Sequence, residues 1–267
     1  METLWIIRHG ERKDNANQEH KNLKHLRSAP HNTPITDLGK EQGFLLGNRI
    51  VCQERRLPKY IYSSPYLRSI ETSIEIANGM EETFKKMRSD KEDNRKIKIR
   101  VEYGLAEPIF ESTERKEIYY DKLLSKEEHY INETMETSML AKKFPDRIDY
   151  KYKSFFRLND IPKRETLKTY GEKILNLKRF INTRKDKLGI LVCHGGLTTD
   201  LCINIDPDIK KMVKSNPSLR KDFFHDMGSS NYGACGLLVL CPIKKQWILT
   251  GGVNNDFLKM RNLHKSI

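Results

Sequence analysis

Two histidines stand just beyond short apolar runs of the chain. Residues 4–7 lead through Arg8 to His9, and residues 190–193 lead to His194; each histidine is followed by glycine. An apolar run of this length that ends at a glycine predicts a strand buried on both faces. Because ligands of open α/β sheets bind at the carboxyl ends of such strands, we expect both histidines to face one pocket.

The residues around the first histidine suit a phosphate. A neutral imidazole is a nucleophile toward phosphorus near pH 7, since its unperturbed pKa is about 6.5, and His9 is therefore the candidate nucleophile. Arg8 and Arg12 carry guanidinium forks that match phosphate oxygens, and Gly10 lets a phosphate approach the backbone. So short a motif also occurs by chance. The glycines after His194 add weight, because they leave N–H groups at a helix start, where anions bind.

Two further candidates follow other predicted strands. Arg68 lies in the first turn of the helix that Pro65 opens, off its apolar stripe, and is able to face the site. Glu107 follows the strand predicted at 97–101 and is expected at the same sheet edge. Each residue alone is equally typical of a solvated surface. Only their expected place at the same sheet edge as His9 makes them candidates.

The predicted elements alternate between strands and helices. This order predicts an α/β fold, a three-layer α/β/α sandwich with a largely parallel central sheet. Strands are expected at residues 3–7, 60–62, 97–101, 190–193, 236–240 and 246–249, and helices at 37–53, 67–77, 167–181 and from 197.

The chain has 267 residues, and we expect residues 1–267 to form a single domain. Residues 109–165 are irregular, charged and aromatic. A connection of this length inside a compact domain predicts an inserted lid, subdomain or specificity region. Its tyrosines and phenylalanines favour an apolar or aromatic phosphoester as the substrate.

The amino-acid composition limits the classes of molecule that the chain is expected to bind. The formal net charge is +13, with 37% hydrophobic and 32% charged residues. A positive surface attracts anions such as phosphoesters, nucleic acid or acidic membranes. The lysines and arginines are dispersed, and no basic run with interleaved aromatic residues resembles a nucleic-acid module, so nucleic acid is not the expected partner.

The five cysteines are odd in number and form no CxxC pair, which predicts reduced thiols in a cytoplasmic protein. The four apolar residues before Arg8 are too few for a signal peptide, and no stretch has the length of a membrane span. A membrane partner is therefore not expected. His20, His25 and His31 follow no familiar metal-ligand spacing and are interpreted as loop residues, with His31 near the substrate mouth.

Five stretches together resemble the histidine phosphatase superfamily, whose fold is that of cofactor-dependent phosphoglycerate mutase. Within it, the chain looks most similar to the suppressor-of-T-cell-receptor-signalling (Sts) and ecdysteroid-phosphate phosphatase branch. The stretches are residues 7–12, 33–36 with Gly39, 64–68, 101–107 and the segment of His194.

The resemblance implies a role for each candidate. His9 becomes a phosphohistidine, and Glu107 is the proton donor. Arg8, Arg12 and Arg68 bind the phosphoryl oxygens together with a cationic His194. With this many cations, neither a metal nor another cofactor is implied, and the substrate is a phosphorylated small molecule or a phosphotyrosine-type ester. The family often forms dimers, and the sequence leaves a homodimer open.

Departures from related patterns narrow the function. Gly195 stands where histidine acid phosphatases carry aspartate, and residues 11–14 lack the motif of the mutases, so both activities are disfavoured. Pro108 stands where the Sts branch tends to have tryptophan, so the resemblance does not extend to the substrate pocket. Two alternatives to a phosphomonoesterase remain: a non-catalytic binder of phosphorylated ligands, and a mutase-type phosphotransferase.

Other phosphatase chemistries fit the sequence less well. A cysteine phosphatase requires Cys-x5-Arg, and neither Cys52 nor Cys193 is followed by arginine at that spacing. Asp206-Pro207-Asp208 resembles the DxD of aspartate phosphatases, but Lys210 stands where that motif has a small hydroxyl or apolar residue.

Overall fold

The computed structural model describes residues 2–13, 32–88, 95–108, 110, 135–162, 164–219, 235–241 and 246–251. These residues form a six-stranded sheet of order β3-β2-β4-β1-β5-β6. The first four strands in that order run parallel, and β5 and β6 are antiparallel additions at one edge. The strands are β1 (Thr3–Arg8), β2 (Tyr60–Ser63), β3 (Lys98–Val101), β4 (Leu188–Cys193), β5 (Cys235–Cys241) and β6 (Gln246–Gly251).

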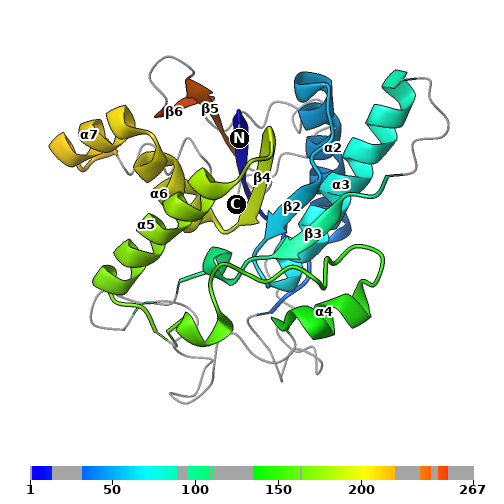
Figure 1. The fold of residues 1–267 in the computed structure, drawn as a ribbon, viewed down its shortest axis with the longest axis horizontal. Coiled ribbons are helices and arrows are strands. Elements are labelled where there is room, and N and C mark those ends of the chain that lie inside the picture. The colour runs from blue at the N-terminus through cyan, green and yellow to red at the C-terminus, as the bar shows by residue number, and fades with distance from the viewer. Residues whose placement is uncertain are drawn as a thin grey trace.

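Helices cover both faces of this sheet. Figure 1 shows α2 and α3 on one side and α5, α6 and α7 on the other. The predicted three-layer sandwich with a largely parallel sheet is therefore confirmed. The helices are α2 (Asp37–Glu54), α3 (Leu67–Arg88), α4 (Thr137–Lys143), α5 (Leu167–Thr183), α6 (Gly195–Ile205) and α7 (Pro207–Ser215). The sequence analysis did not predict α4 or α7.

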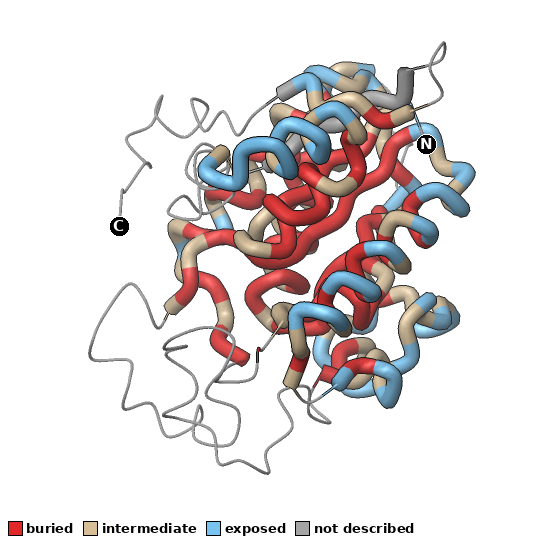
Figure 2. The backbone as a smooth tube through the Cα atoms, turned by 90° about the vertical axis from the view of Figure 1, so that its left-hand side faces the viewer, coloured by how far each residue is buried: buried red, intermediate tan, exposed pale blue. Residues whose placement is uncertain are grey.

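The strand pattern explains the two halves of the core. Successive side chains of a strand point to opposite faces, so Trp5 and Ile7 pack with α2 and α3 while Leu4 and Ile6 pack with α5 and α6. All four are at most 2% exposed, which confirms the prediction of a strand buried on both faces. In Figure 2 the buried segments run through the middle, and the exposed residues lie on the outer faces of the helices.

The connections after β1 and β4 create a place for a ligand. The two strands are parallel neighbours. The chain leaves β1 for α2 on one face of the sheet and leaves β4 for α6 on the other. Such a topological switch point leaves a crevice at the carboxyl ends of the strands, where ligands of open α/β sheets bind.

Part of the predicted lid region packs beside the sheet. The Ile99 amide of β3 donates to the Arg147 carbonyl at 2.7 Å, and the Asp149 amide donates back to Ile99 at 2.8 Å. Leu140 and Ile148 are buried in the core cluster that contains α3. Residues 135–162 thus extend the scaffold at the β3 edge. The lid and specificity role of 109–165 stays a prediction, and residues 111–134 lie outside the described part.

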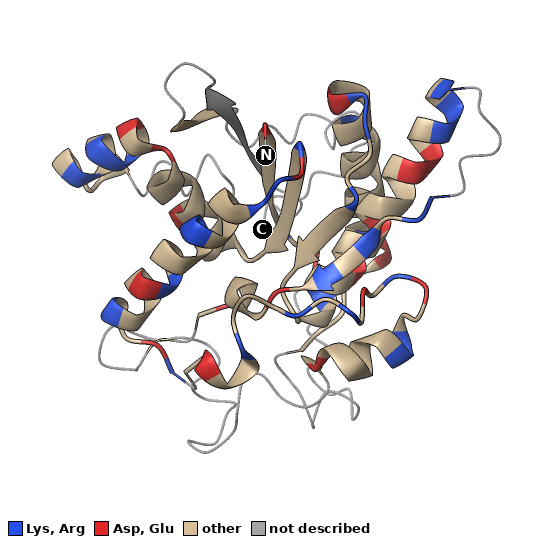
Figure 3. Ribbon diagram, viewed as in Figure 1, with Lys and Arg blue, Asp and Glu red and all other residues tan. Residues whose placement is uncertain are grey.

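Charged residues of both signs are interspersed along the described helices (Figure 3). Among the described residues, no helix combines the length and the apolar character that crossing a membrane requires.

Candidate active site

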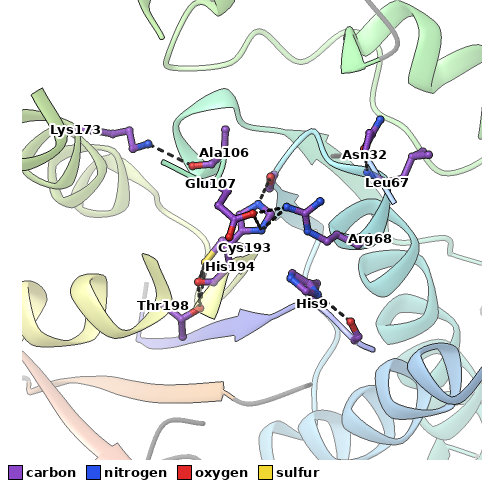
Figure 4. A network of polar contacts seen from close by, with 12 residues as sticks. His9, Asn32, Leu67, Arg68, Ala106, Glu107, Lys173, Cys193, His194 and Thr198 are labelled. Atoms are coloured by element: carbon purple, nitrogen blue, oxygen red, sulfur yellow. Dashed lines mark hydrogen bonds and ion pairs between the residues drawn. The ribbon is translucent and has the colours of Figure 1, made fainter. Parts of the chain in front are cut away.

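The sheet register brings the two histidines together. Arg8 pairs with Cys193, and the His9 amide donates to the Cys193 carbonyl at 3.1 Å, so His9 and His194 emerge side by side. Their ring centroids are 5.4 Å apart, and both residues are at most 3% exposed. Figure 4 shows both at the ends of their strands, with Arg68 and Glu107 close by.

Two glycines allow the loop after β1 to pack against the start of α2. A Cβ on Gly10 would lie 2.5 Å from the Gly39 carbonyl oxygen, and a Cβ on Gly39 would lie 2.6 Å from the Glu11 carbonyl oxygen. The Thr36 side chain caps α2 by accepting from the Gly39 amide at 2.9 Å. The stretch around Thr36 therefore holds the loop that carries His9.

The backbone fixes which nitrogen of His9 can attack. Nδ1 lies 2.8 Å from the Gly10 carbonyl oxygen. Because a carbonyl only accepts, Nδ1 carries the proton and Nε2 keeps the lone pair. The Gly10 amide in turn donates to Thr72 Oγ1 of α3 at 2.9 Å, which holds the loop in place.

The surroundings of His9 keep it neutral. Burial lowers its pKa well below the usual 6.5, and the charges of Arg68 and Arg8 lower it further. Desolvation and nearby cations both disfavour the imidazolium form. His9 therefore has the protonation state that a nucleophile needs.

Arg68 links the other candidates. It is fully buried in the first turn of α3, and its guanidinium lies 4.2 Å from the Tyr66 ring centroid. Nη2 donates to Glu107 Oε2 at 2.5 Å and to His194 Nδ1 at 3.3 Å. One guanidinium thus holds a carboxylate and an imidazole against each other.

His194 is neutral in this arrangement. Its Nδ1 accepts from Arg68, and its Nε2 lies 2.8 Å from Ser64 Oγ. Burial lowers its pKa well below 6.5, and the charge of Arg68 lowers it further. Burial and Arg68 therefore favour the neutral form here, in contrast to the cationic His194 that the resemblance implies. A cationic His194 would suit a bound anion, but the sequence does not show that the ring is buried or that Arg68 donates to its Nδ1.

Glu107 follows a turn that a second carboxylate stabilises. The short 3-10 helix η3 (Tyr103–Leu105) follows β3, and Glu102 caps it. The Glu102 carboxylate accepts hydrogen bonds from two side chains and three amides, at distances of 2.6 to 3.3 Å: Ser154 Oγ, Tyr152 Oη and the amides of Phe155, Phe156 and Gly104. The chain then places Glu107, whose side chain is 29% exposed, with Oε2 3.7 Å from His194 Nδ1.

The two remaining arginines lie at the same edge. Arg12 is 8% exposed and forms an antiparallel bridge with Ile35, and its charge lowers the pKa of both His9 and His194. Arg8 runs beside the start of α6, where a Cβ on Gly195 would lie 3.3 Å from Arg8 Cδ. The structure thus brings all six predicted site residues to the carboxyl ends of the central strands.

Three supporting residues received no role in the sequence analysis. Ser64 contacts His194, Thr72 holds the His9 loop, and Lys173 donates to the Ala106 carbonyl at 3.3 Å. Ser64 follows a predicted strand, which was a usable signal. Lys173 lies between the apolar positions 170 and 174 of its helix, so a charge on the buried face was also visible in the sequence.

Two competing chemistries find no support in the described residues. Burial raises the pKa of the Cys193 thiol to about 12, so it is not a thiolate at neutral pH. Asp206 is the N-cap of α7, accepting from the amides of Asp208 and Ile209, which gives the DxD-like stretch a structural role. Within the described part of the chain, no group of three His, Cys, Asp or Glu is placed to hold a metal; His20, His25 and His31 lie outside that part.

Residues 4–92 match the model of the histidine phosphatase superfamily (branch 1). Ecdysone phosphate phosphatase from Bombix mori has a similar structure (TM-score 0.59, 18% identity, 96% of each chain covered). Phosphoglycerate mutase from Bacillus anthracis str. Sterne is also similar in structure (TM-score 0.53, 15% identity, 96% of this chain and 95% of that chain covered). So is phosphoserine phosphatase from Entamoeba histolytica (TM-score 0.52, 15% identity, 97% of this chain and 100% of that chain covered).

No curated protein sequence matches this chain significantly. At these identities, the structural likeness shows a shared fold, and the family match adds the region that carries His9, Arg12 and Arg68. The resemblance noted from the sequence is thereby confirmed at the level of the superfamily. Over residues 4–92, the chain is similar to the histidine phosphatase superfamily.

Proposed function

We propose that this chain is a metal-independent phosphomonoesterase that works through a phosphohistidine on His9. A phosphatase is the enzyme class that the family match supports. The observation that carries the proposal is the meeting of a neutral His9 with His194, Arg68 and Glu107 at one strand edge. In this proposal, the nucleophile, the proton carrier and the cations for the phosphoryl oxygens act together on one bound phosphate.

In the first step, His9 Nε2 attacks phosphorus and the ester P–O bond breaks. Glu107 in its protonated form gives its proton to the leaving oxygen. The guanidinium groups of Arg8, Arg12 and Arg68 balance the charge on the non-bridging oxygens, which is the main task in phosphoryl transfer.

In the second step, the Glu107 carboxylate takes a proton from water, and the water oxygen attacks phosphorus. The P–N bond breaks, and its electron pair returns to Nε2. Inorganic phosphate leaves, and the protonated Glu107 is ready for the next cycle.

The Arg68 contacts explain how the site responds to an anion. A phosphoryl group competes with Glu107 for the Arg68 guanidinium. Its negative charge also favours the imidazolium form of His194, opposite to the effect of Arg68. The cationic His194 is thus proposed for the substrate-bound state, in which Nδ1 is protonated and donates to the phosphoryl group instead of accepting from Arg68.

The test is turnover of p-nitrophenyl phosphate with a chelator present. We expect activity in the wild type and a loss of about 10³-fold or more in His9→Ala, because the nucleophile is gone. Circular dichroism confirms that the variant is folded. Undiminished turnover in His9→Ala contradicts the proposal.

The substrate is proposed to be a phosphorylated small molecule or a phosphotyrosine-type ester. An apolar or aromatic ester follows from the aromatic 109–165 region, and a panel of phosphoesters at several pH values tests it. A phospholigand binder would bind inorganic phosphate without turnover. A mutase would exchange monophosphoglycerate isomers instead of releasing phosphate. The cytoplasmic location and the homodimer stay predictions from the sequence.

A further inference from the structure

A buried ion pair lies behind the proton donor. Lys173 of α5 and Glu165 just before that helix are 5% and 3% exposed and form an ion pair. Lys173 Nζ also donates to the Ala106 carbonyl at 3.3 Å, and Ala106 is the residue before Glu107. Figure 4 shows this lysine reaching from its helix to Ala106, on the side of Glu107 away from His9.

Stability alone does not account for this pair. Removing two charges from water costs about as much as their attraction returns, and an apolar pair of equal volume is often as stable. Burial lowers the pKa of the Lys173 ammonium, with Glu165 opposing that shift. Within the described part of the chain, Glu165 Oε2 is buried and has no hydrogen-bond partner, so the pair is not optimised as a structural contact.

The same lysine lies near the site without entering it. Its charge lowers the pKa of His194, and the charge of Glu107 acts on Lys173 in turn. Its hydrogen bonds, however, are with the Glu165 carboxylate and the Ala106 backbone. Lys173 thus holds the backbone on one side of Glu107 while Arg68 holds the side chain from the other.

We propose that Lys173, held by Glu165, is a positioning residue that fixes the Ala106–Glu107 backbone and so aims the Glu107 carboxyl at the leaving oxygen. This inference rests on the proposed function. Glu102 anchors the beginning of the turn and Lys173 its end, so Glu107 has little freedom to swing away. Losing the second anchor harms proton transfer more than phosphate binding.

Comparing two esters with different leaving groups distinguishes a positioning role of Lys173 from a merely structural one. A p-nitrophenolate leaves with little acid assistance, whereas an alkoxide depends on the proton from Glu107. In Lys173→Met we expect kcat/KM for an alkyl phosphate to fall about 10- to 100-fold, as a misplaced catalytic group produces. For p-nitrophenyl phosphate, kcat/KM should stay within about threefold, because it reports only the first step, in which this leaving group needs little acid assistance; affinity for inorganic phosphate should be unchanged. Equal losses on both esters overturn the proposal.

Two variants make the comparison secure. Lys178→Met is the matched control, because Lys178 lies on the same helix and donates to the Asn204 carbonyl at the same 3.3 Å, away from Glu107. It should leave both esters unaffected. Lys173→Met with Glu165→Gln removes the lone buried charge that would threaten folding of the single variant, and it should keep the alkyl-ester defect.

Hydrogen exchange tests the positioning without relying on turnover. The Leu105 and Ala106 amides donate to Glu102 and Tyr103 at 3.0 Å each. We expect them to exchange faster in the double variant than in Lys178→Met, and equal rates overturn the inference. If the wild type hydrolyses neither ester, the proposed phosphatase function fails, and the exchange rates still decide whether Lys173 holds the turn.

Discussion

Two carboxylates five positions apart occupy opposite kinds of environment. Glu102 is fully buried and accepts hydrogen bonds from two side chains and three amides. Glu107 is 29% exposed and contacts Arg68, with His194 at 3.7 Å. A carboxylate whose oxygens are fully engaged holds structure, whereas one with an exposed edge can exchange protons with a substrate or water. The difference lies in the partners that the fold supplies, because the residue type is the same.

The largest effect is expected from Glu107→Gln. It removes the proton carrier, so kcat for alkyl phosphates should fall about 10²- to 10⁴-fold. The free energy of unfolding should fall by less than in a variant of the fully buried Glu102, because the glutamine amide oxygen can still accept from Arg68 Nη2, although the buried guanidinium loses its ion pair. Affinity for inorganic phosphate, measured by calorimetry, should not weaken, because Arg68 is released from its carboxylate partner. A variant that loses stability but keeps its kcat would reverse the roles assigned to the two glutamates.

Glu102→Gln is the same substitution on the other side of the turn. An amide cannot accept from all the donors that face this carboxylate, so the free energy of unfolding should fall by about 2–4 kcal/mol. Urea denaturation measures this loss. At a temperature where the variant is folded, its kcat should exceed that of Glu107→Gln. If the two variants are equally stable, the contrast between a structural Glu102 and a proton-carrying Glu107 is wrong.

The pH dependence of stability tests the burial on which the site depends. The pKa of both His9 and His194 is lowered well below 6.5 in the folded protein. Below about pH 6.5 the unfolded chain therefore binds protons that the folded protein does not, and stability falls by about 1.4 kcal/mol per pH unit for each histidine. The loss ends only when the pH passes the lowered folded values.

Denaturation between pH 7.5 and 5 (roughly the range in which histidine titrates) measures this slope. His194→Asn should remove about half of the contribution of the two histidines, because one of the two groups is gone. A stability that stays level over this range in the wild type would mean that the two rings are not held neutral.

The smallest effect is expected from Tyr152→Phe. It removes one donor to Glu102, a hydrogen bond of 2.7 Å, and leaves the others in place. The free energy of unfolding should fall by about 1 kcal/mol, with kcat unchanged. A large fall in kcat would show that the Glu102 cluster acts on the chemistry directly and not only through the turn.

The sequence revealed the parts of the site that depend on local pattern. The apolar runs before His9 and His194 predict buried strands, and the structure places these strands side by side as β1 and β4. Thr36 can be predicted as a helix cap because it directly precedes Asp37 at the start of the helix. These signals are local because strand burial and capping are encoded within a few residues.

Other features depend on distant contacts and were missed or misjudged. The protonation of His194 depends on its burial and on Arg68, 126 positions away. Helix α4 is short, has no side-chain cap and buries only Leu140, so its periodic signal is weak. Asp206 before Pro207 was a readable start signal for α7, but the stretch was weighed as a DxD motif instead.

The central claim is that the phosphoryl group passes through His9. The direct measurement is rapid quenching of Glu107→Gln after mixing with p-nitrophenyl phosphate, followed by peptide mass spectrometry. That variant still loses p-nitrophenolate but lacks the base for water, so an acid-labile phosphoryl group should accumulate on His9 together with a burst of p-nitrophenol. A phosphoryl group on another residue, or turnover of p-nitrophenyl phosphate by His9→Ala, would contradict the account.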